Sequence, residues 1–176
     1  MKGCDKWKHN SIINRLDKKY LGFPASTLVQ TRKGPKPMNQ LTIGDSLFGI
    51  DPQSSIPGFS PIEAWLQHDP HAEADFDTVL TDNGARFESS ALQNFAFVRN
   101  NKIDYKFARD LTEGEQLVSF PERGARVTGR ESGVRRKGLF APFTAFHNYF
   151  VFEAGTVEGS EARMVLVHAL SQVDQP

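Results

Sequence analysis

The pattern Leu-Thr-x-Gly-acid-x-Leu occurs twice in this 176-residue chain, as LTIGDSL from residue 41 and as LTEGEQL from residue 111. In each copy the glycine, Gly44 or Gly114, can adopt the positive φ of a tight turn, and the acidic residue after it can accept hydrogen bonds from nearby backbone N–H groups. The flanking leucines are candidates for the core. The repeat therefore predicts an internal duplication, with two related β half-units around a pseudo-two-fold axis. Chance repetition of so short a pattern is the alternative.

Short runs rich in β-forming residues follow residue 20, each bounded by Gly, Pro, Asn or Asp. They are STLVQT, DSLFGI, DTVLTD, NFAFV, EQLVSF, NYFVFEA and RMVLVHAL. Asn83-Gly84 predicts a β-hairpin turn, and RKGPKP predicts a second turn. Helical periodicity is not sustained anywhere after residue 20, and only residues 62–67 predict a single helical turn. The expected fold class is all-β.

The bulk composition excludes several classes of protein. Lys+Arg and Asp+Glu are balanced at 21 each, so no net charge favours nucleic acid or a membrane surface. No apolar run is long enough to span a bilayer, and residues 1–20 lack the apolar core of a signal peptide. The single cysteine, Cys4, excludes a disulfide framework and a Cys-based zinc cluster. We expect a basic tail or linker over 1–20, one domain over 21–172, a short tail over 173–176, no cofactor and a monomer.

The segment GFPASTLVQTRKGPKPMNQLTIGDSLFGID resembles the opening of the hedgehog-type Hint module, an autoprocessing domain related to inteins. The segment FSPIEAWLQHDPHAEADFDTVLTDNGARF looks like the middle of the nematode hedgehog-related versions, and FARDLTEGEQLV is similar to the family's second-half segment. GLFAPFT, residues 138–144, is similar to the family's Gly-x-Tyr-Ala-Pro-Leu-Thr segment. Taken in order, the matches cover residues 22–170. The resemblance implies the Hint fold, with two pseudo-symmetric β halves.

The resemblance also implies a reaction, which is self-cleavage. In the family, a Cys at the first position of the module attacks the preceding carbonyl and forms a thioester. A second nucleophile, a sterol in hedgehog proteins, then takes the acyl group. A His handles the proton of the amide nitrogen, and a Thr helps to distort or hydrogen-bond the scissile amide. The resemblance further implies a role in cell signalling and a secretory or extracellular location.

The three residues that this chemistry needs are absent from the matching positions. Gly22 stands where the family has its Cys, and a glycine has no side chain with which to attack. The family's Thr-x-x-His aligns on ALQNFAFV, which places Ala91 at the Thr position and Asn94 at the His position. A shift by one residue gives Ser90 and Gln93 instead, still without a base. The alignment therefore predicts a pseudoenzyme.

Two groups of histidines remain as candidates. His168, in VLVHA, matches the His of the intein ending Val-Val-His-Asn, so it is a possible relic of the site; a strand-end or core histidine is the alternative. His68 and His71, with Asp69 and Asp75 nearby, have the residue types of a metal site. We favour a solvated loop for that segment and expect no metal.

The segment 121–138 is rich in Lys, Arg and Gly and predicts an exposed loop. The alternative interpretation is an anion-binding loop. Its candidate residues are Arg123, Arg126, Arg130, Arg135, Arg136 and Lys137.

These observations support three hypotheses. The first is a degenerate hedgehog-type Hint domain that serves as a binding or structural domain. Its partners would be the upstream segment of its own precursor and a peptide or small ligand in the old cleft. The second is an active autoprocessing domain with unconventional or mutated catalytic residues. The third is a polyanion binder that uses residues 123–137, which the balanced charge disfavours. Because the sequence stops just after the last expected strand, sterol transfer is not expected.

Overall fold

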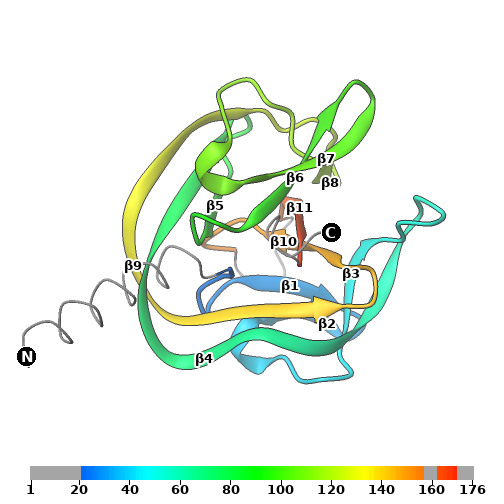
Figure 1. The fold of residues 1–176 in the computed structure, drawn as a ribbon, viewed down its shortest axis with the longest axis vertical. Helices are drawn as coiled ribbons and strands as arrows, with labels where there is room; N and C mark the ends of the chain where they lie inside the picture. Colours follow the sequence, from blue (N-terminus) through cyan, green and yellow to red (C-terminus); the bar gives the residue numbers. More distant parts are fainter. Residues whose placement is uncertain (1–20, 157–161, 170–176) are drawn as a thin grey trace, which may run out of the picture.

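The structure is a computed structural model that describes residues 21–156 and 162–169. This part of the chain consists of strands joined by turns and by two short 3-10 helices (Figure 1), so the all-β prediction is confirmed. The strands are β1 (Leu28–Thr31), β2 (Gly34–Pro37), β3 (Ser46–Ile50), β4 (Pro57–Thr81), β5 (Arg86–Ser89), β6 (Asn94–Arg99), β7 (Lys102–Phe107), β8 (Ser119–Phe120), β9 (Val127–Thr144), β10 (Asn148–Phe152) and β11 (Met164–His168). The 3-10 helices are η1 (Met38–Gln40) and η2 (Ala108–Asp110).

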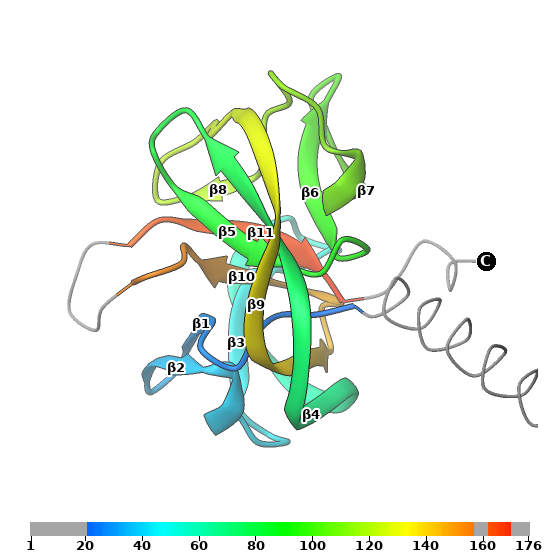
Figure 2. The same ribbon diagram turned by 90° about the vertical axis from the view of Figure 1, so that its left-hand side faces the viewer.

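The centre of the molecule is formed by β10 and β11, which pair antiparallel along their whole length. Every residue of both strands is buried, which explains why NYFVF and MVLVH are apolar almost throughout. The strand order is β5-β4-β3-β1-β10-β11-β6-β7, with β2 beside β1, β8 beside β11 and β9 beside β4. β10 and β11 cross the middle of the molecule, with β1 and β2 on one side and β6 and β7 on the other (Figure 2). One face of the central strands packs on the larger core, and the other packs on a smaller cluster around Phe150 and Leu166.

A long antiparallel ribbon of β4 and β9 curves around the body of the molecule (Figure 1). It corrects two predictions, because residues 62–67 lie in β4 instead of forming a helical turn, and residues 127–138 lie in β9 instead of a loop. The middle of this ribbon is mostly exposed, so its polar and glycine-rich composition does not prevent strand formation. The register shift between Asp69 and Glu73 accommodates the Pro70 segment.

The hairpin predicted at Asn83-Gly84 is confirmed, since β4 and β5 pair antiparallel on either side of it. Gly84 has a φ of +80°, and its N–H donates to the Thr81 carbonyl at 3.0 Å. Leu80 is the last β4 residue paired with β5, opposite Arg86.

The two copies of the repeated pattern form the same turn. Gly44 and Gly114 both have positive φ, +96° and +90°. The Gly44 N–H donates to Ile62 O at 3.1 Å, and the Gly114 N–H donates to Val127 O at 2.8 Å. Each copy follows a 3-10 helix, η1 or η2, and leads into a short strand, β3 or β8. The correspondence is one of geometry; its origin in a duplication stays a prediction.

The acidic residue of each turn accepts hydrogen bonds from its own turn and from a lysine. Asp45 accepts from the Thr42 N–H at 3.0 Å and from the Lys36 ammonium at 3.4 Å. Glu115 accepts from the Thr112 hydroxyl at 3.0 Å and from Lys106. Burial alone would raise the pKa of Asp45, but the Thr42 and Lys36 contacts outweigh it and lower that pKa; Glu115 behaves in the same way.

We expect Asp45→Asn to lower the free energy of unfolding by about 1–2 kcal/mol near neutral pH, because it removes the ionised acceptor of charged hydrogen bonds. A lowered folded pKa stabilises the fold above the unfolded pKa, and this stabilisation is lost as the pH falls through the folded pKa. The difference in free energy of unfolding between wild type and variant, measured by urea denaturation, should therefore shrink below about pH 4. A difference that stays constant down to pH 2 would contradict this role for the carboxylate.

Candidate functional site

The segment from Leu21 to Phe23 enters the core beside the end of β9. Leu21 is 7% exposed and Phe23 is fully buried. The Phe23 N–H donates to Phe140 O at 2.9 Å, and the Phe140 N–H donates to Phe23 O at 3.0 Å. The Gly22 carbonyl accepts from the Ser90 N–H at 2.9 Å. Gly22 is therefore held on one side by β9 and on the other by the turn between β5 and β6.

The backbone at Gly22 fits only glycine. Its φ is +133°, a conformation that residues with a Cβ rarely adopt. A Cβ built at Gly22 would lie 2.5 Å from Phe140 O and 2.9 Å from Phe140 C, well inside van der Waals contact. The position that matches the family's nucleophile thus has no side chain, and the surrounding backbone leaves no room for one.

The residues that match Thr-x-x-His lie just beyond Gly22, on the turn that leads into β6. Ala91 is half-buried, and its carbonyl accepts from the Arg109 N–H at 3.0 Å. Asn94, the first residue of β6, is fully buried. The residues of the shifted alignment make the direct contacts: Ser90 binds the Gly22 carbonyl, and the Gln93 side-chain N–H donates to His168 O at 2.9 Å. Among the described residues, the buried Ser90 hydroxyl has no hydrogen-bond partner.

His168 lies at the centre of a cluster of polar side chains, here called the His168 cluster, formed by Asn94, Tyr105, His147, Asn148 and His168. On β11, His168 is paired with Asn94 of β6 on one side and with Asn148 of β10 on the other. The His168 ring lies 4.4 Å from the Tyr105 ring and 6.4 Å from the His147 ring, centroid to centroid. The sheet therefore brings two predicted positions, Asn94 and His168, onto neighbouring strands.

Sequence reasoning missed Asn148, Tyr105 and His147 as members of this cluster. Asn148 is buried, and its side chain both accepts from the Ile50 N–H at 2.8 Å and donates to Ile50 O at 2.9 Å, which ties β3 to β10. An asparagine that begins an otherwise apolar strand was a usable signal. Tyr105 and His147 carried no signal, because only the fold places them beside His168.

The His168 cluster can donate and accept hydrogen bonds, but it offers little for nucleophilic attack. Its members supply imidazole, amide and phenol groups, and none of them is a thiol or an aliphatic hydroxyl. The only cysteine of the sequence, Cys4, lies outside the described residues. The His168 cluster therefore supplies hydrogen-bonding groups but no thiol or aliphatic hydroxyl nucleophile of its own.

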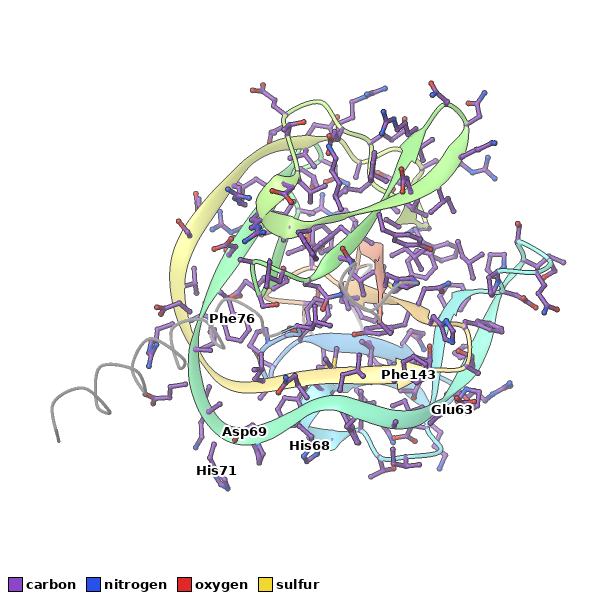
Figure 3. The ribbon with its side chains drawn as sticks, viewed as in Figure 1. Glu63, His68, Asp69, His71, Phe76 and Phe143 are labelled. Atoms are coloured by element: carbon purple, nitrogen blue, oxygen red, sulfur yellow. The ribbon has the colours of Figure 1, made fainter. Side chains whose placement is uncertain are left out.

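The histidines predicted as a solvated loop or, alternatively, a metal site lie on β4 instead (Figure 3). The loop prediction is wrong, because β9 pairs with this stretch of β4. The His68 ring packs on Trp65 at 4.8 Å and on Phe140 at 5.2 Å, centroid to centroid. The Asp69 carboxylate caps the bend by accepting from the His71 N–H at 3.0 Å. In residues 21–156 and 162–169, no group of three or more metal-ligating side chains is found.

The predicted basic loop is divided between the 121–126 turn and the strand β9. The Arg130 guanidinium donates to Ala108 O at 3.0 Å, and two neighbours pair with acids of the same chain, Arg135 with Asp75 at 3.3 Å and Arg136 with Glu88 at 2.8 Å. Anion binding by these residues stays a prediction. An anion would have to compete with the acidic partners of Arg135 and Arg136. In the part of the chain that the structure describes, no helix is long and apolar enough to cross a membrane.

A family model for the Hint module matches residues 13–151. This chain belongs to the Hint module family. The Hint module described here is 31% identical over 109 residues to Warthog protein 4 of Caenorhabditis elegans, an alignment that covers 61% of this chain and 18% of that protein. It is 28% identical over 153 residues to Warthog protein 8 of the same organism, covering 79% of this chain and 27% of that protein. The chain thus spans less than a third of these relatives.

The fold is that of the inteins. A DnaB intein from Synechocystis superposes with a TM-score of 0.66 at 11% sequence identity, covering 85% of this chain and 99% of that one. At this identity the likeness concerns the fold alone. The predicted hedgehog-type Hint fold is confirmed, and the relatives are consistent with its hedgehog-related type.

Proposed function

We propose that this Hint module no longer cleaves itself and that it remains covalently joined to the segment before it, as a binding or structural domain. The observation that carries the proposal is the backbone at Gly22. The reaction of the family begins with a side-chain nucleophile at this position, and Gly22 has neither the side chain nor space for one.

The surroundings of Gly22 support the same conclusion. The family's scissile bond would join Leu21 to Gly22, and both residues are buried. The Ser90 N–H already binds the Gly22 carbonyl, and Phe23 already pairs with Phe140. These contacts fix the segment as a structural part of the domain. A segment held in this way serves to anchor the upstream chain to the sheet.

The composition of the His168 cluster supports the proposal. Asn94 and Asn148 flank His168 across the sheet, and Tyr105 covers its ring. A side-chain amide neither takes up nor releases a proton near neutral pH, so Asn94 cannot replace the histidine that would protonate the leaving amide nitrogen. The former site is therefore expected to hold hydrogen-bonding partners without processing them.

Intact mass of a fusion tests the proposal. A reporter protein is placed before residue 1 and the fusion is incubated with dithiothreitol or hydroxylamine near neutral pH, since either nucleophile releases a thioester or ester. We expect the fusion to stay whole. A Hint module that carries the family's cysteine, in the same fusion, is the positive control and should split. A split of this chain between Leu21 and Gly22 would overturn the proposal and would favour an unconventional active enzyme.

A further inference from the structure

A groove separate from the His168 cluster opens between the turn after β3 and the loop after β8. Its volume is about 520 Å³, within the range of small-molecule sites. It is lined by apolar side chains that include Ile50, Val98, Val118 and Phe150. Two large apolar residues that also line it are unusually exposed, Ile103 at 45% and Phe120 at 39%. Apolar surface of this kind is typical of a binding site.

The groove contains a single charged side chain, Arg123. Within residues 21–156 and 162–169, no carboxylate lies within ion-pair distance of its guanidinium, although Arg86, Arg136 and Arg163 each have an acidic partner at 2.7–2.8 Å. An apolar groove with one unpaired cation at its side is complementary to an apolar ligand that ends in one anionic group.

The backbone around the groove indicates which apolar ligand fits. An extended peptide needs free backbone donors and acceptors, yet those of Val118 and Ile50 are already used. The Val118 N–H donates to Ala96 O at 3.1 Å, and Val118 O accepts from the Leu166 N–H at 2.8 Å. The N–H and carbonyl of Ile50 are both bound by the Asn148 side chain. A hydrocarbon chain needs none of these groups.

We propose that this groove binds a long-chain carboxylate, with the hydrocarbon chain along Ile50, Val118 and Phe150 and the carboxylate on Arg123. The proposal is independent of the loss of self-cleavage, because none of Gly22, Ser90, Asn94 or His168 lines the groove. It assigns to this Hint module a ligand site that does not use the former catalytic positions.

Displacement of a fluorescent fatty acid, dansylaminoundecanoate, from the full chain tests the site, with myristate and 1-tetradecanol as competitors below their aggregation limits. We expect saturable one-to-one binding and a preference of roughly tenfold for myristate over the alcohol, the effect of one charge-assisted contact. Arg123→Gln should abolish that preference while leaving the affinity for the alcohol unchanged. Ile103→Glu should abolish binding of both competitors.

The matched control is Arg135→Gln, which removes a charge from β9 outside the groove and should change neither affinity. A preference for myristate that survives Arg123→Gln would overturn the role of that arginine. Absence of saturable myristate binding would overturn the proposal that the groove binds a long-chain carboxylate. Binding of an acidic apolar peptide without binding of myristate would overturn it too. Both substituted side chains are exposed, and the thermal unfolding of each variant shows whether the fold is intact.

Discussion

Gly22→Ala is expected to lower the free energy of unfolding by about 2–6 kcal/mol, the sum of backbone strain and overpacking, each of about 1–3 kcal/mol. The strain arises because alanine would have to adopt a φ of +133°. The overpacking arises because its Cβ would lie 2.5 Å from the Phe140 carbonyl oxygen. Urea denaturation of the two proteins measures the difference.

Gly114→Ala is the matched control for Gly22→Ala. Gly114 also has a positive φ, +90°, but nothing lies within 4 Å of the position that a Cβ would occupy. The loss in free energy of unfolding caused by Gly114→Ala should therefore come from backbone strain alone, about 1–3 kcal/mol. Equal losses at the two sites would show that Phe140 yields easily, and the claim that position 22 has no room for a cysteine would then be wrong.

Phe23→Ala is expected to cost about 3–5 kcal/mol, as for a fully buried phenylalanine. The Phe23 ring is 0% exposed and packs edge-on against Tyr149 at a centroid distance of 6.3 Å. Because Phe23 follows Gly22 directly, its removal should also loosen the anchored segment, which hydrogen exchange of the Phe140 amide would detect.

Phe120→Ala provides the comparison, since it removes the same side chain from a position that is 39% exposed. It should cost less than about 1.5 kcal/mol, because less apolar area is lost from the interior. A Phe23→Ala variant no less stable than Phe120→Ala would contradict the view that the segment around Gly22 is a structural part of the domain.

The elements that the sequence predicted best were those with a local physical cause. The turn glycines Gly44 and Gly114 have the positive φ that the repeat required, and the hairpin at Asn83-Gly84 forms where expected. The buried strands β10 and β11 were readable because both of their faces are covered, which leaves a continuous apolar run. The family resemblance added the fold, which short strands alone could not specify.

The ribbon of β4 and β9 could not be predicted locally. Its middle is exposed, so the sequence lacks the alternation that normally indicates a strand. Local preference favours a helical turn over 62–67 and a loop over 121–138, yet 62–67 lie in β4 and 127–138 in β9. The pairing that makes them strands connects residues far apart in the chain, such as His68 with Phe140. Long-range pairing decided the structure where local preference was weak.

The sequence names Gly22, Asn94 and His168 as candidates, and the sheet brings the last two onto neighbouring strands. Their roles stay predictions. Ser90, which contacts Gly22, belongs to the alternative alignment. That contact is a hydrogen bond between backbone groups, which side-chain identity in the sequence does not reveal. Asn148 and Tyr105 required the cross-strand register, which no sequence pattern fixed.

The most direct test of the central claim is a tryptic map of the upstream fusion after prolonged incubation with hydroxylamine. Trypsin should release the peptide that runs from residue 20 to residue 32, which contains the Leu21–Gly22 bond. We expect this peptide to be recovered in full, with none that begins at Gly22. Accumulation with time of a peptide that begins at Gly22 would show that the bond is cleaved, and the module would then be an active autoprocessing domain.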